Sequence, residues 1–149
     1  MQQFNSPLEA FNHWVLKTPD STFLRQPINR NFIEYTFSSA NEEVRKIANA
    51  LIKNGVQPGD HVALLSKNCA HWIIADVAIM MGGYVSVPLY ASLAADQFKL
   101  VLEKSDAKAV FVGKLDEWNK KSKGLIDGMP VMRFPEYPGN AKVTQGTAW

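Results

Sequence analysis

Residues 82–90 read Gly-Gly-Tyr-Val-Ser-Val-Pro-Leu-Tyr and follow directly on the apolar run Trp72–Met81. Glycine predicts the end of a helix here, because it adopts the left-handed backbone conformation at low cost. Tyr84–Val87 then predicts a short buried strand, which Pro88 is expected to end. In open α/β folds, the loops after the carboxyl ends of parallel strands bind ligands. The stretch therefore predicts both an architecture and a candidate site.

Strands and helices alternate on either side of this stretch. His61–Leu65, Ala109–Val112 and Val131–Phe134 are apolar enough to predict further buried strands. Repeated β-α-β units indicate an α/β fold with a mostly parallel sheet and helices on both faces. The predicted helices are Cys69–Met81 with Asn68 as its cap, one marked by Phe98, Val101 and Leu102, and a short one near Asp116–Lys121. Because the run that ends at Met81 is apolar nearly all round, its helix should be covered on more than one side.

The amino-terminal third predicts two helices and a β-hairpin. A first helix opens at Ser6-Pro7, since proline suits the first helical position. The β-rich runs Thr22–Arg25 and Phe32–Phe37 are separated by a short polar segment, which predicts a hairpin ahead of the parallel sheet. Ser39 and Glu42 have the spacing of a capping box for the second helix.

The periodic pattern stops at Phe134. Residues 135–149 contain proline and glycine breakers and no periodicity, and they end on Trp149. We expect residues 1–134 to form the α/β unit and residues 135–149 to form an irregular tail that leads into a missing remainder.

Composition predicts a soluble globular domain and excludes several classes of protein. The 149 residues are 46% hydrophobic and 20% charged, with a net charge of +2. Nucleic-acid binding is not expected, because the one dense basic cluster, Lys120–Lys123, is typical of a solvated helix end. The single cysteine, Cys69, fits a reducing cytosol. No signal peptide or apolar run of membrane-spanning length occurs, so we expect a cytoplasmic protein without a transmembrane segment.

The residues alone indicate no complete active site. No set of closely spaced glycines follows a strand, as a phosphate-binding loop would require. His13, His61 and His71 are scattered over different predicted elements, so no metal site is expected. No serine lies in a Gly-x-Ser-x-Gly elbow. We therefore assign no catalytic and no metal-binding residue to this chain.

Five short motifs in one order resemble the amino-terminal part of the AMP-forming acyl-CoA synthetases, within the adenylate-forming superfamily. They are Tyr35-Thr36-Phe37-Ser38, Leu51-x-x-x-Gly55-Val56-x-Pro58-Gly59-Asp60-x-Val62-Ala63, Ser66-x-Asn68-x-x-x-Trp72, Gly83-x-Val85-x-Val87-Pro88-Leu89 and Ser105-Asp106-Ala107-Lys108-Ala109-Val110-Phe111. Among members of the family, Phe23-Leu24, Phe32–Phe37 and Val87–Tyr90 look most like long-chain fatty acid–CoA ligases.

The resemblance implies a parent enzyme that uses ATP, Mg²⁺ and coenzyme A to convert a fatty acid into its acyl-CoA, releasing AMP and pyrophosphate. It also implies that this chain is an amino-terminal subdomain whose partner is the remainder of that ligase. The family's phosphate loop is absent from the 149 residues. We therefore expect the chain alone to be inactive and to bind none of these cofactors tightly.

The resemblance carries over one candidate binding region, on the coenzyme A side. It comprises Tyr90, Ala91 and Ser92 beside the pantetheine path, and Lys120 and Lys121 near the nucleotide end. Relatives that form acetyl-CoA have glycines at the positions of Ala91 and Ser92. Because this sequence carries side chains at both positions, a ligand can approach the backbone less closely here. Packing of the loop by Leu89 and Tyr90 is the alternative role.

Three other interpretations stay open. The acid could be an aromatic or amino acid, the chain could be a non-catalytic assembly module such as a homodimer interface, or it could be a free-standing nucleotide-binding domain. The expected cytoplasmic location also allows the parent enzyme to bind peripherally to a membrane.

Overall fold

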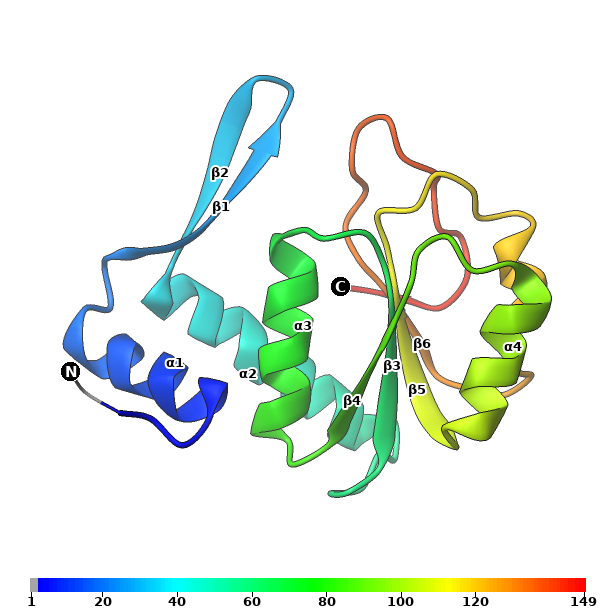
Figure 1. The fold of residues 1–149 in the computed structure, drawn as a ribbon. Helices are drawn as coiled ribbons and strands as arrows, with labels where there is room; N and C mark the ends of the chain where they lie inside the picture. The colour runs from blue at the N-terminus through cyan, green and yellow to red at the C-terminus, as the bar shows by residue number, and fades with distance from the viewer. Residues whose placement is uncertain (1–2) are drawn as a thin grey trace.

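A five-stranded parallel sheet forms the centre of the structure, a computed structural model that describes residues 3–149 (Figure 1). Its spatial order is β4-β3-β5-β6-β7, so the chain crosses over between neighbouring strands, as the alternating pattern predicts. The strands are β3 (His61–Leu65), β4 (Val85–Leu89), β5 (Ala107–Val112), β6 (Val131–Arg133) and β7 (Thr147–Ala148).

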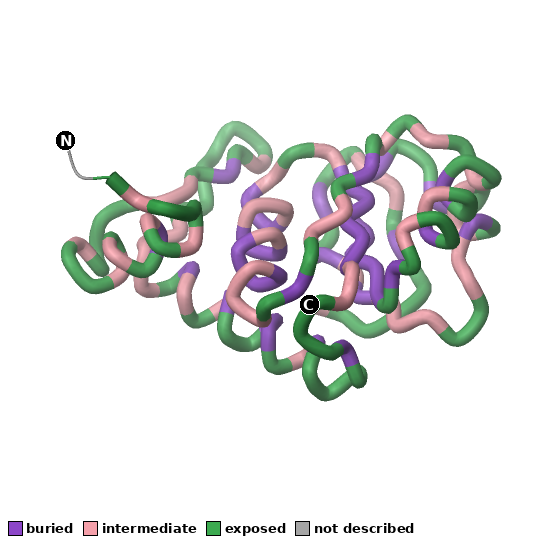
Figure 2. The backbone as a smooth tube through the Cα atoms, turned by 60° about the horizontal axis from the view of Figure 1, so that its bottom comes forward, coloured by how far each residue is buried: buried purple, intermediate pink, exposed green. Residues whose placement is uncertain are grey.

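Helices cover both faces of this sheet, as predicted. One face packs against α2 (Phe37–Lys53) and α3 (Ala70–Met81), and α1 (Pro7–Lys17) contacts these two helices. The other face packs against α4 (Ala95–Lys104), and a 3-10 helix at Lys121–Gly124 contacts α4. Figure 2 shows the buried residues concentrated along the sheet and on the helix turns that face it.

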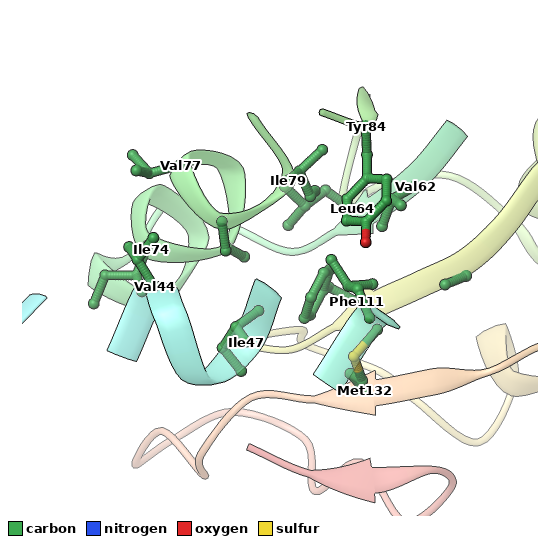
Figure 3. Packing of buried hydrophobic residues seen from close by; sticks show 14 of the residues in the cluster. Val44, Ile47, Val62, Leu64, Ile74, Val77, Ile79, Tyr84, Phe111 and Met132 are labelled. Atoms are coloured by element: carbon green, nitrogen blue, oxygen red, sulfur yellow. The ribbon is translucent and has the colours of Figure 1, made fainter. Parts of the chain in front are cut away.

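Two apolar cores result, one on each face. In the larger core, Leu64 of β3 and Phe111 of β5 pack with Ile74 of α3 and Met132 of β6 (Figure 3). In the smaller core, Phe98 of α4 and Val110 of β5 are fully buried. Successive residues of β5 thus serve opposite cores, which is why this strand is a continuous apolar run.

Helix α3 is covered on several sides, which confirms the expectation from its apolar surface. It contacts α1, α2, β3 and β4, and also the hairpin strand β1 (Thr22–Ile28).

Both predicted caps are displaced. Helix α2 begins at Phe37, and its capping box joins Thr36 and Ser39, not Ser39 and Glu42, because the β2 strand leads directly into the helix. Helix α3 has Cys69 at its N-cap, not Asn68, and the Cys69 side chain makes no capping hydrogen bond.

A distant side chain satisfies the start of α3 instead. The Gln26 side chain is buried, and its Oε1 accepts a hydrogen bond from the Ala70 amide at 2.8 Å. A buried helix terminus requires such a partner for its free N–H groups. The hairpin therefore supplies a cap that the local sequence of α3 lacks.

Pro88 continues strand β4 instead of ending it. It pairs in register with Leu64, and the strand runs on to Leu89. Strand β4 lies at the edge of the sheet, where one side of the backbone needs no hydrogen-bond donors, so proline is tolerated there.

The predicted hairpin is present and consists of β1 and β2 (Asn31–Thr36), paired antiparallel. It extends away from the parallel sheet (Figure 1). Asn29 and Arg30 form the turn and both have positive φ angles, which a tight two-residue hairpin turn requires.

The chain after β5 differs from its predicted local structure. The short helix expected near Asp116–Lys121 is replaced by the 3-10 helix at Lys121–Gly124. Residues 135–149 return to the sheet, where β7 pairs parallel with β6. Trp149 then packs against the larger core.

Candidate functional site

The carboxyl ends of β3 and β4 border a cleft of about 470 Å³, which we call the β3–β4 cleft. In open α/β folds ligands bind at this end of a parallel sheet, and ligand binding in this cleft stays a prediction. The cleft is lined by Ser66, Lys67, Asn68, Trp72, Pro88, Leu89, Tyr90 and Ala91.

Polar contacts hold the loop after β3 in place. Ser66 is buried, and its Oγ donates to the Lys67 carbonyl at 2.7 Å. Lys114 Nζ donates to the Asn68 carbonyl at 3.0 Å, and Lys67 forms an ion pair with Asp116. These contacts fix the loop to the carboxyl end of β5, so one wall of the cleft is anchored.

A second cleft, of about 530 Å³, lies at the carboxyl end of β5; we call it the β5 cleft. The Lys67–Asp116 ion pair links the linings of the two clefts. The lining of the β5 cleft carries charges of both signs and consists of Asp116, Glu117, Trp118, Asn119, Lys120, Ala141, Lys142 and Thr144.

The structure brings together some of the predicted coenzyme-side residues and separates others. Tyr90 and Ala91 line the β3–β4 cleft, where Tyr90 is 81% exposed, and Ser92 is exposed beside them. Lys121 reaches the same loop, because its Nζ donates to the Leu93 carbonyl. Lys120 instead lines the β5 cleft, with its Nζ 3.8 Å from Glu117 Oε2.

One buried polar cluster escaped the sequence analysis. His71, near the start of α3, has its Nδ1 2.5 Å from the Tyr137 hydroxyl and its Nε2 3.3 Å from the Tyr35 hydroxyl. The Trp149 ring packs edge-on against the His71 ring, with centroids 5.0 Å apart. His71 thus joins the hairpin, α3 and the carboxyl-terminal segment. Its partners lie 36 and 66 residues away in the sequence, and no local spacing signals such a contact.

Burial governs the protonation of this cluster. Desolvation lowers the pKa of His71 from 6.5 to about 4, and the nearby Glu43 carboxylate offsets only part of that effect. Desolvation also raises the pKa of the hydroxyls of Tyr35 and Tyr137. All three groups are therefore neutral near pH 7, which is consistent with a structural role for His71.

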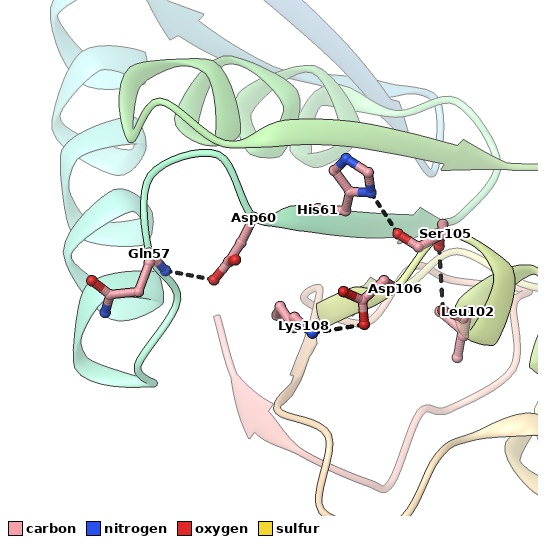
Figure 4. A network of polar contacts seen from close by, with 7 residues as sticks. All are labelled: Gln57, Asp60, His61, Leu102, Ser105, Asp106 and Lys108. Carbon is pink, nitrogen blue, oxygen red and sulfur yellow. Dashed lines mark hydrogen bonds and ion pairs between the residues drawn. The ribbon is translucent and has the colours of Figure 1, made fainter.

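Polar contacts also occur at the amino ends of the strands (Figure 4). His61 Nδ1 donates to the Ser105 carbonyl, and Asp60 Oδ2 accepts from the Gln57 amide at 2.7 Å. Asp106 pairs with Lys108 at 2.7 Å. These contacts fasten the turns before β3 and β5 at the end of the sheet opposite the two clefts.

Within residues 3–149, no group of three or more histidine, cysteine or acidic side chains is placed to hold a metal ion. No helix in the same range is long and apolar enough to cross a membrane.

Comparisons with known proteins give matches in both sequence and fold. The family model described as AMP-binding enzyme matches residues 11–143. The chain is 36% identical over 115 residues to the long-chain-fatty-acid–CoA ligase FadD15 of Mycobacterium bovis, covering 77% of this chain and 19% of that one. It is 30% identical over 113 residues to long chain acyl-CoA synthetase 2 of Arabidopsis thaliana, covering 72% and 17%.

A solved structure shares the fold. The putative long-chain-fatty-acid CoA ligase of Rhodopseudomonas palustris superposes with a TM-score of 0.73 at 20% identity, over 95% of this chain and 34% of that one. The present chain thus spans about a fifth of the length of the two curated relatives above.

Proposed function

Because this chain belongs to the AMP-binding enzyme family, we propose that it is the amino-terminal part of an AMP-forming long-chain fatty acid–CoA ligase. The observation that carries the proposal is the 36% identity to a long-chain-fatty-acid–CoA ligase, which extends over 115 residues of the chain. In the proposed reaction, the fatty acid carboxylate attacks the α-phosphate of ATP and displaces pyrophosphate. The coenzyme A thiol then attacks the acyl carbon and displaces AMP.

The described residues fit only part of this chemistry. No glycine-rich phosphate loop occurs in the sequence, and residues 3–149 contain no cluster of metal-ligating side chains. The sequence therefore provides no glycine-rich cradle for the phosphates of ATP. We propose that the chain supplies scaffold and one wall of a cleft, that its partner is the remainder of the ligase, and that the enzyme works in the cytoplasm.

The purified 149-residue chain should catalyse no fatty-acid-dependent exchange of pyrophosphate into ATP, because the phosphates lack a binding loop. The measurement is incorporation of labelled pyrophosphate into ATP with palmitate and Mg²⁺, with FadD15 as the positive control. Calorimetry with ATP, AMP and coenzyme A should show no tight binding. Clear exchange by the chain alone, or tight binding of ATP, would refute the assignment of the chain as a non-catalytic part.

For coenzyme A, the groups that fit are Tyr90 and Ala91 in the β3–β4 cleft and Lys121 beside their loop. Their proposed role is to hold the pantetheine arm, while coenzyme A itself supplies the thiol nucleophile. The Tyr90 side chain is exposed and makes no hydrogen bond within residues 3–149, so it can be changed without loss of a core contact.

In the full-length protein that contains this sequence, Tyr90→Ala should raise the KM for coenzyme A about three- to tenfold, the range expected for one aromatic contact. Adenylate formation, followed by pyrophosphate release without coenzyme A, should be unchanged. The matched control is Leu100→Ala, an exposed apolar residue on α4. An unchanged KM for coenzyme A would leave Tyr90 with a packing role only.

A further inference from the structure

An apolar pocket lies on the side of the molecule formed by α1 and α3. It has a volume of about 370 Å³, within the size range of pockets that hold small ligands. Side chains from α1, α2, α3 and β1 line it. The pocket is separate from both clefts, since its lining shares no residue with theirs.

Aromatic rings dominate the lining. Phe23 packs against Phe11 with ring centroids 5.2 Å apart and against Phe37 at 4.8 Å. Trp14 of α1 also lines the pocket and is 41% exposed. The faces of such rings attract cations as well as apolar groups.

Asp76 is the one charged residue in this lining. It lies on the otherwise apolar helix α3 and is half-buried, and within residues 3–149 its carboxylate has neither an ion pair nor a hydrogen bond. The pocket therefore combines apolar and aromatic walls with an unused negative charge.

We propose that this pocket binds a small organic cation with an apolar body, of the alkylammonium class. The ammonium group would pair with the Asp76 carboxylate, and the alkyl chain would pack against Phe11 and Trp14. An alkyl carboxylate is disfavoured, because its charge repels that of Asp76. The proposal goes beyond the ligase assignment and does not depend on it.

Three probes of equal chain length test the proposal on the 149-residue protein: hexylammonium, hexanol and hexanoate. Binding is followed by chemical-shift changes of the Trp14 indole and the Ala10 and Val77 amides in two-dimensional NMR spectra. Hexylammonium should bind about tenfold more tightly than hexanol, the size expected for one charge-assisted contact. Hexanoate should bind more weakly than hexanol.

Asp76→Asn should abolish the preference for the cation and leave the affinity for hexanol within about twofold. The matched control is Asp96→Asn on α4, at the opposite face of the sheet, which should keep the preference. Equal binding of hexylammonium and hexanol by the wild-type protein would overturn the proposal without any variant. Retention of the preference by Asp76→Asn, or shifts confined to residues outside the pocket, would also overturn it.

Discussion

Phe111→Ala is expected to destabilise the protein by about 3–5 kcal/mol, the usual cost of removing a fully buried phenylalanine. Phe111 lies on β5 with no exposed surface, and its ring is 6.1 Å from that of Phe134 and 6.2 Å from that of Trp149. The alanine leaves a cavity in the larger core, between the sheet and the helices α2 and α3, where the sheet backbone has little freedom to collapse. Urea unfolding at pH 7, followed by circular dichroism, measures the difference.

The control for this experiment is Leu100→Ala, whose side chain is exposed on α4. Its free energy of unfolding should stay within about 0.5 kcal/mol of the wild-type value. A loss below about 1 kcal/mol for Phe111→Ala would contradict the packing of the larger core described above.

The wild-type protein is expected to lose about 3 kcal/mol of stability through His71 as the pH falls from 7 to 4. The pKa of His71 is about 4 in the folded protein and 6.5 when the side chain is solvated. Between these values the unfolded chain binds a proton that the folded chain does not. The free energy of unfolding therefore decreases as the pH decreases. The contribution is fully present above pH 6.5 and lost below about pH 4.

His71→Gln isolates this effect, since glutamine remains neutral and can still donate and accept hydrogen bonds. The free energy of unfolding is measured by urea titration at steps between pH 7.5 and 4. Over this range, the free energy of unfolding of the variant should decrease by about 3 kcal/mol less than that of the wild type. His13→Gln is the control and keeps the number of histidines equal to that in the variant. Parallel curves for the wild type and His71→Gln would show that the imidazole is not desolvated.

The sequence predicts the alternating part of this fold well, for physical reasons. A run such as Ala109–Val112 has no exposed face, and helix α2 presents a regular apolar stripe from Val44 to Leu51. The burial of both can therefore be recognised from the local sequence. The prediction that Pro88 ends its strand is wrong, because the effect of a proline depends on whether the strand lies at an edge of the sheet, and that is a property of the whole topology. The displaced cap of α3 has the same origin, since Gln26 lies 44 residues from Ala70.

Of the candidate sites, too, one can be located from the local sequence and another depends on the assembled fold. The β3–β4 cleft follows from a general rule about parallel strands, so its loop could be located from residues 82–90 alone. The pocket around Asp76 could not, because it forms only where α1, α3 and the hairpin meet. Lys120 and Lys121 are adjacent in the sequence, yet Lys120 lines the β5 cleft while Lys121 Nζ donates to the Leu93 carbonyl, since the 3-10 helix that starts at Lys121 turns the chain between them.

The contacts of His71 are completed only late in the synthesis of the chain. Tyr35 precedes His71 in the chain, but Tyr137 and Trp149 follow it by 66 and 78 residues. At roughly 5–20 residues per second, the ribosome takes about 4–16 s to add those residues. During that interval the helices α1–α3 and the hairpin can already assemble, while the imidazole lacks its contacts with Tyr137 and Trp149. The larger core is thus incomplete, with His71 solvated at its edge, until residues 137–149 have been synthesised.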